Sequence, residues 1–222
     1  MQGYTPKIHF KCRTSTFREI CNLLVRRFGD PFVERLRLLQ ISQFLRLPLM
    51  PQNVPLIYML LSKRDMKTKS FIIKGQSLEF TSDEVALLIG MPNRGIIFDV
   101  GSARSNGKTS NDIRHDIERM DNTTRMEDLV KGFVLYLLSN IFYPMMNFRI
   151  SSSILEVIKN VDSFNKYNWP ESIRGFLVQE FNIVATKQAK GSALSYVNGF
   201  VIIIIVSIVI LFNRSLVNLQ IL

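Results

Sequence analysis

The sequence predicts a mainly α fold: a multi-helix globular domain with one small β-hairpin near residues 70–80. Three observations lead to this prediction. Apolar residues recur at steps of three and four over much of the chain, helix-capping and helix-ending residues bound these segments, and one short stretch has a strand-turn-strand pattern around a Lys-Gly pair. Of the 222 residues, 47% are hydrophobic, which is enough to build a core.

The first quarter of the chain predicts three helices. Thr16 and Glu19 have the spacing of a capping box, and they precede an apolar face of Phe17, Ile20, Cys21, Leu24, Val25 and Phe28. Gly29 and Pro31 end this helix. A second helix is predicted over residues 32–46, ending before Pro48, and a third, short one over 56–61.

The hairpin and a well-marked helix come next. Two short strands flank Lys74-Gly75-Gln76 within residues 70–80. Thr81, with Glu84 three residues later, then starts a helix that runs to Ile89, where Gly90 and Pro92 end it.

The second half is again helical. A charged surface helix is predicted near residues 112–120, and a helix over 126–142 is apolar on nearly all sides, which predicts a central position. A short helix follows near 153–159. Asn168 and Trp169 then begin a helix whose inner face is Ile173, Phe176, Leu177 and Phe181.

The positive charge is concentrated near the start of the chain. The net charge is +10, and residues 1–75 hold 14 of the 28 Lys and Arg but only 4 of the 18 Asp and Glu. This asymmetry is typical of a protein that meets nucleic acid or an anionic membrane surface, and the other interpretation is a solvated face. The candidate phosphate contacts, chosen because they cluster, are Arg26, Arg27, Arg35, Arg37, Lys63, Arg64, Lys67 and Lys69.

Signals for catalysis, metals or cofactors are weak. Gly107-Lys108-Thr109 resembles the end of a phosphate loop, but five residues instead of four separate Gly101 from Gly107, so we interpret Lys108 as an exposed loop residue. His9 and His115 are the only histidines, and the acids near His115 (Asp112, Asp116, Glu118 and Asp121) alternate with arginines as surface ion pairs do. Cys12 and Cys21 cannot make a disulfide framework or a zinc site of ordinary spacing. We therefore expect no enzyme, no metal, no cofactor and no small-molecule substrate.

Two blocks of the sequence resemble the plant mobile domain family, also labelled aminotransferase-like and associated with plant transposons. The first is FIIKGQSLEFTSDEVALLIGMPNRG, in which Thr81, Glu84, Val85, Ala86, Leu88, Gly90, Met91, Pro92 and Gly95 carry the match. The second covers residues 132–181, with Tyr167, Asn168 and Trp169 as its clearest positions, and it is followed by SYVNGFVIIII, so that the resemblance spans roughly residues 30–210. Pro170 and Phe200 depart from the residues usual in that family.

The resemblance implies a nuclear, non-enzymatic protein that binds nucleic acid or chromatin proteins, with a possible part in gene silencing or genome maintenance. It establishes no catalytic residues. We interpret Gly90, Pro92, Gly95, Asn168 and Trp169 as residues that define the fold, with Trp169 as a buried anchor.

The apolar stretch over residues 196–212 leaves two alternatives open. It is long enough to form either a core helix or a marginal membrane span, which would make the protein tail-anchored in the endoplasmic reticulum. The predicted organisation is thus a flexible basic N-terminus over 1–15 without a secretory signal, a helical domain over 16–195, the apolar helix over 196–212 and a short tail over 213–222.

Overall fold

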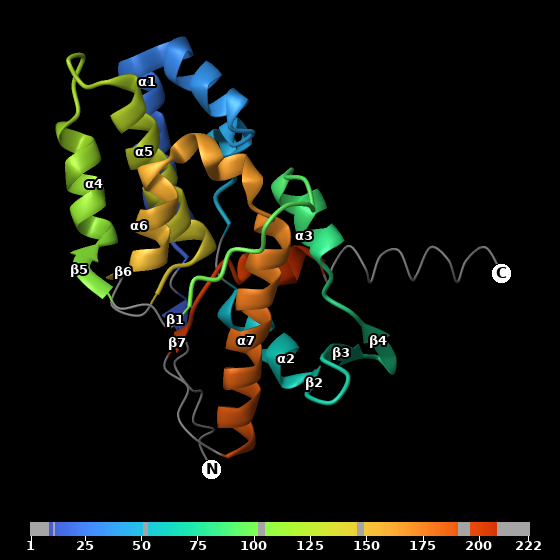
Figure 1. Ribbon diagram of the computed structural model, residues 1–222. Helices are drawn as coiled ribbons and strands as arrows, with labels where there is room; N and C mark the ends of the chain where they lie inside the picture. The colour runs from blue at the N-terminus through green and yellow to red at the C-terminus, as the bar shows by residue number, and fades with distance from the viewer. Residues whose placement is uncertain are drawn as a thin grey trace.

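The computed structural model describes residues 9–10, 12–50, 53–101, 105–145, 149–190 and 196–207. Within them the fold is mainly α, with small sheets of two or three strands, as the sequence predicts (Figure 1). Helix α5 (Met126–Leu137) packs against α1 (Thr14–Leu38), α4 (Ser110–Arg119) and α6 (Ser152–Lys159). The prediction that this segment is central is confirmed, because Leu129, Val130 and Phe133 are buried.

The N-terminal helix is longer than predicted and bent. α1 begins at Thr14, and the predicted capping box at Thr16 is wrong: the Thr16 hydroxyl donates to the carbonyl of Arg13 from within the first turn. Gly29 has φ 60° and ψ −149°, which interrupts the helix at the predicted place, but the chain resumes helical geometry at once and continues to Leu38. The two halves of α1 therefore meet at an angle, visible at the top of Figure 1.

The predicted helix over residues 32–46 ends early. The amide of Ile41 donates to the carbonyl of Leu36 and the amide of Gln40 to that of Arg37, with Gln40 at φ 55°. This is the Schellman arrangement, and the burial of Leu36 and Ile41 supplies its usual apolar contact. A separate 3₁₀ helix, η1 (Ser42–Arg46), follows.

The segment from residue 53 to residue 90 follows the prediction closely. α2 (Val54–Ser62) begins after Asn53, whose side chain accepts from the amide of Leu56. β2 (Arg64–Asp65), β3 (Ser70–Ile73) and β4 (Gln76–Leu78) form an antiparallel sheet, and the predicted hairpin pairs Ile73 with Gln76 across Lys74-Gly75. α3 (Ser82–Ile89) has the predicted capping box between Thr81 and Glu84 and ends at Gly90, which has φ 66°.

Lys108 lies on a strand that leads directly into a helix. β5 (Ser105–Thr109) pairs antiparallel with β6 (Arg149–Ser151), and Thr109 caps α4 by accepting from the amide of Asp112. No loop stands between this strand and the helix that could surround a phosphate. Lys108 instead makes an ion pair of 2.8 Å with Asp116.

The last helices close the domain. α5 continues into the π-helical turn η2 (Leu138–Phe142), and α6 is followed by the 3₁₀ helix η4 (Val161–Lys166). α7 (Trp169–Ala189) crosses the middle of the molecule and packs on α3 and α2, with the predicted inner face of Ile173, Phe176, Leu177 and Phe181 buried (Figure 1).

Trp169 is the centre of an aromatic cluster. Its side chain is 1% exposed, its ring stacks on Phe164 at 4.5 Å between ring centres, and its Nε1–H donates to the carbonyl of Phe164 at 2.9 Å. The other rings around it belong to Phe98, Phe142, Tyr143 and Tyr167. Trp169 is thus the buried anchor that the sequence predicts. Asn168, the residue before it, caps α7 by accepting from the amide of Glu171.

A strand at the start of the described chain pairs with a strand close to its end. β1 (His9–Phe10) pairs in parallel with β7 (Tyr196–Val197), and Cys12 is buried, so the described part of residues 1–15 belongs to the folded domain and not to a flexible end as predicted. The prediction of one apolar helix over 196–212 is wrong at its start, because Tyr196 and Val197 form β7 and the helix begins only at residue 202. Residues 202–207 are helical, and residues 200–204 are buried in the core. No helix within the described ranges has both the length and the apolar character to cross a bilayer. The remainder of the predicted apolar helix, 208–212, and the tail over 213–222 lie outside these ranges.

Candidate anion-binding groove

The predicted phosphate contacts do not form one surface. Arg26, Arg27, Arg35 and Arg37 lie on α1, whereas Lys63, Arg64, Lys67 and Lys69 lie on or beside β2 and β3 at the opposite side of the molecule (Figure 1). A single phosphate-binding patch made from all eight residues is therefore ruled out. The fold leaves only some of these side chains free to contact a phosphate.

Arg64 is not available, and its prediction as a phosphate contact is wrong. Its side chain is buried, with Nη1 donating to the carbonyl of Lys69 at 2.9 Å and Nε to Oδ1 of Asn182 at 3.3 Å. The guanidinium lies 5.0 Å from the centre of the Phe71 ring. Burial, and then the positive charge of Arg174, lowers the pKa of Arg64. Arg64 thus joins the β2–β3 sheet to α7.

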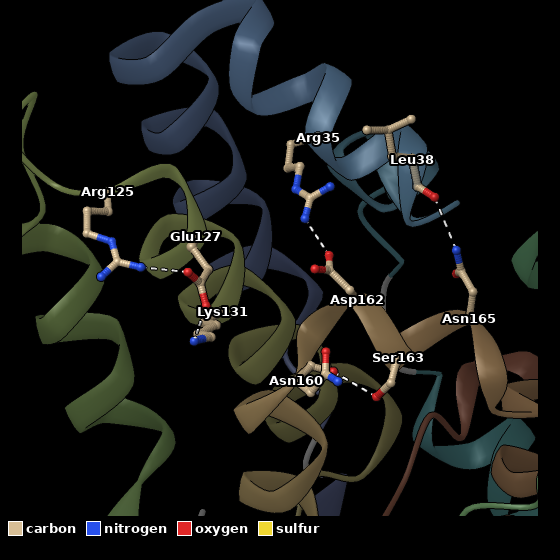
Figure 2. Close-up of polar contacts among 9 residues, drawn as sticks. All are labelled: Arg35, Leu38, Arg125, Glu127, Lys131, Asn160, Asp162, Ser163 and Asn165. Carbon is tan, nitrogen blue, oxygen red and sulfur yellow. Dashed lines mark hydrogen bonds and ion pairs between the residues drawn. The ribbon is translucent and has the colours of Figure 1, made fainter.

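Two of the α1 arginines are used to hold the fold. Arg27 donates to the carbonyls of Glu118 and Met120, which ties α1 to the end of α4. Arg35 makes an ion pair with Asp162 on η4, and three residues later on α1 the carbonyl of Leu38 accepts from Asn165 at 3.1 Å (Figure 2). These contacts fasten the second half of α1 to η4 and so set its angle to the first half.

The bend in α1 opens a groove of about 730 Å³. One wall comes from the first half of α1, one from the second half, and the third from η1. Three arginines line it, Arg26, Arg37 and Arg46, together with the polar residues Asn22, Ser42 and Gln43 and the apolar residues Val25, Val33 and Leu45. No acidic residue is among these.

The three arginines that line the groove differ in their ion pairing. Arg37 pairs with Glu34 one turn earlier on α1. Arg26 and Arg46 are exposed and make no ion pair with the part of the chain that the structure describes. Arg26 also borders a smaller hollow lined by Glu19 and Glu118, but Arg114 lines that hollow too and pairs with both glutamates. Guanidinium groups present paired N–H donors that match phosphate oxygens, which makes this groove suited to anions.

Arg46 and Gln43 were missed at the level of sequence. In the predicted helix over 32–46 their side chains would continue the path of α1, and no periodicity places them opposite Arg26. The Schellman turn at Gln40 folds η1 back so that Arg46 lines the same groove as Arg26. Lys63, Lys67 and Lys69 are exposed on the other side and do not line this groove.

The charged helix α4 shows ordinary surface ion pairing, as predicted. Arg114 bridges Glu19 and Glu118, at 3.1 and 2.8 Å, and His115 lies 3.3 Å from Glu118. The hydrogen bond from Arg114 lowers the pKa of Glu118. No group of three potential metal ligands is brought together by the described residues.

Fold and groove together define a mainly α domain with a cationic surface groove. Residues 10–205 match the family described as a domain of unknown function, DUF8566, so the chain belongs to that family. No curated protein and no solved structure matches the chain.

Proposed function

We propose that this protein is a non-enzymatic nucleic-acid-binding module that holds the phosphate backbone in the α1–η1 groove. The observation that carries this proposal is the convergence of Arg26, Arg37 and Arg46 on a groove that no acidic residue lines. Phosphate contacts of this kind are tolerant of sequence and supply most of the affinity of non-specific binding.

The charge of the chain supports the same proposal. Residues 14–46, which contain α1 and η1, hold six arginines against three acidic residues, a net charge of 6 − 3 = +3. A positive field over these elements raises the rate of encounter with a polyanion. A nuclear location, and a role in gene silencing or genome maintenance through nucleic acid or chromatin partners, follow from the resemblance to plant mobile domain proteins and are part of the proposal.

Fluorescence anisotropy with a labelled 12-nucleotide strand tests the groove directly. A variant in which Arg26, Arg37 and Arg46 are changed to Gln removes three contacts. Each phosphate contact on a single strand contributes about 0.7 to the slope of log K against log salt, so three contacts contribute about 2. Over the tenfold range from 1 M to 0.1 M salt this slope corresponds to roughly 100-fold in affinity, and we expect the variant to bind more weakly by about that factor at 0.1 M salt.

The matched control removes the same charge elsewhere. A variant with Lys63, Lys67 and Lys69 changed to Gln has the same net charge as the groove variant, but its three positions lie outside the groove. We expect this control to change the affinity by less than about threefold, because the Debye length at this salt is only about 10 Å. Equal losses for the two variants would mean that net charge alone attracts the strand, and absence of binding by the unaltered protein would refute the proposal. Circular dichroism confirms that each variant is folded.

A further inference from the structure

An apolar pocket adjoins the arginine groove. Its volume is about 310 Å³, and Gln43 and Arg46 line both hollows, so the two share one wall. The rest of the pocket comes from three separate segments: the chain just after η1, the end of α3, and the chain after β7. Leu47, Leu87 and Phe200 represent these three segments.

Hydrogen bonds hold the walls of this pocket in place. Nε2 of Gln43 donates to the carbonyls of Ile89 and Gly90, at 3.1 and 3.2 Å, which joins η1 to the end of α3. The hydroxyl of Ser207 donates to the carboxylate of Glu84 at 3.1 Å, which joins helical residues 202–207 to the start of α3. A pocket braced in this way exists before a ligand arrives.

We propose that this pocket takes one unstacked base of a single-stranded nucleic acid whose phosphates lie in the arginine groove. This inference rests on the proposed function and adds the class of nucleic acid to it. A base has an apolar face and a polar edge, which matches apolar walls bordered by the two polar side chains Gln43 and Arg46. In a duplex the bases are stacked and paired, so the pocket favours single strands.

Size and charge select a base over other occupants. Small-molecule sites range from about 300 to about 1,000 Å³, and this pocket is at the lower end, so it suits a compact ring better than a long acyl chain. Arg46 lies where the two hollows meet, so a group held in the pocket has a cation beside it. The phosphate next to an inserted base fills that position.

The first test changes the ligand and leaves the protein intact. Anisotropy compares a labelled 12-nucleotide strand with an abasic strand of the same length, which keeps every phosphate and loses every base. We expect the abasic strand to bind about 5- to 160-fold more weakly, the range that the loss of one held base, worth about 1–3 kcal/mol, produces. A 12-base-pair duplex is expected to bind more weakly than the single strand.

The second test changes the pocket. Leu87 lines it and is 65% exposed, so Leu87→Gln leaves the core intact. Ile183 is 48% exposed on α7 and lines neither hollow, so Ile183→Gln is the matched control. We expect Leu87→Gln to weaken binding of the normal strand about three- to tenfold, by loss of apolar contact with the base, and to leave binding of the abasic strand unchanged. Ile183→Gln should change neither.

The outcomes separate this inference from the proposed function. Equal affinity for the normal and abasic strands overturns the base pocket while the groove stands. Failure of both strands to bind overturns the groove as well. Tighter binding to vesicles of anionic phospholipid, or to an acidic peptide with an apolar side chain, together with the same Leu87→Gln loss on that ligand, would assign the pocket to that ligand and overturn the inference.

Discussion

Changing Gly95 to Ala tests how the segment after α3 is joined to the start of α7. Gly95 has φ 114°, and a Cβ atom at this position would lie 2.4 Å from the carbonyl oxygen of Lys166, a backbone atom that has no rotamer to change. Two backbone hydrogen bonds flank this contact: the amide of Ile96 donates to Lys166 at 2.8 Å, and the amide of Asn168 donates to Ile96 at 2.7 Å. A shift that relieves the clash lengthens both.

The expected loss of stability is about 2–6 kcal/mol. Backbone strain at a positive φ contributes about 1–3 kcal/mol, and weakening two hydrogen bonds contributes about 0.5–1.5 kcal/mol each. Because Trp169 follows Asn168 directly, the shift also reaches the aromatic cluster.

Urea denaturation followed by tryptophan fluorescence measures this loss, since Trp169 is the only tryptophan. Gly175→Ala is the matched control: Gly175 lies within α7, and an added Cβ meets nothing within 4 Å. We expect this control to raise the stability by about 0.5–1 kcal/mol through helix propensity. A free energy of unfolding for Gly95→Ala within about 0.5 kcal/mol of the unaltered protein would contradict the role assigned to the close approach of Gly95 and Lys166.

Two further predictions concern the bend in α1 and the buried thiols. Gly29→Ala places a side chain at φ 60° and ψ −149°, so we expect urea denaturation to show a loss of about 1–3 kcal/mol and anisotropy to show weaker strand binding; unchanged values in both would mean that the bend does not depend on glycine. Burial raises the pKa of the Cys21 thiol to about 12 and raises that of Cys12 as well, so both stay protonated in the folded protein while the unfolded thiols ionise above about pH 8.5. The contribution of these thiols to the free energy of unfolding is therefore fully present below that pH. Above it the free energy of unfolding falls, by up to about 1.4 kcal/mol per pH unit for each thiol. Equal stability at pH 8 and pH 10 would contradict their burial.

Local signals predict the segments that depend on short-range chemistry. The capping box of Thr81 and Glu84, the ending of α3 at Gly90 and the hairpin turn at Lys74-Gly75 all form as predicted, because each involves residues within four positions of one another. The central α5 and the inner face of α7 were also predicted, since a strong apolar periodicity survives any tertiary arrangement.

Long-range packing decides the features that were not predicted. Gln40 takes a positive φ that glycine usually provides, so the end of α1 carries no sequence signal, and the burial of Ile41 is what stabilises it. Arg64 resembles its neighbours Lys63 and Lys67 in the sequence, yet Phe71 and Asn182 enclose it. For the same reason charge clustering alone does not separate Arg26 and Arg37, which line the groove, from Arg27 and Arg35, whose partners come from distant elements.

The dependence of binding on salt measures the central claim most directly. Anisotropy titrations of the 12-nucleotide strand between 50 and 200 mM salt give the slope of log K against log salt for the unaltered protein and for the variant with Arg26, Arg37 and Arg46 changed to Gln. Three phosphate contacts account for about 2 units of that slope, so the variant should be less steep by about this amount, while the Lys63, Lys67 and Lys69 variant keeps the original slope. A slope that stays the same when the three groove arginines are removed would contradict the account.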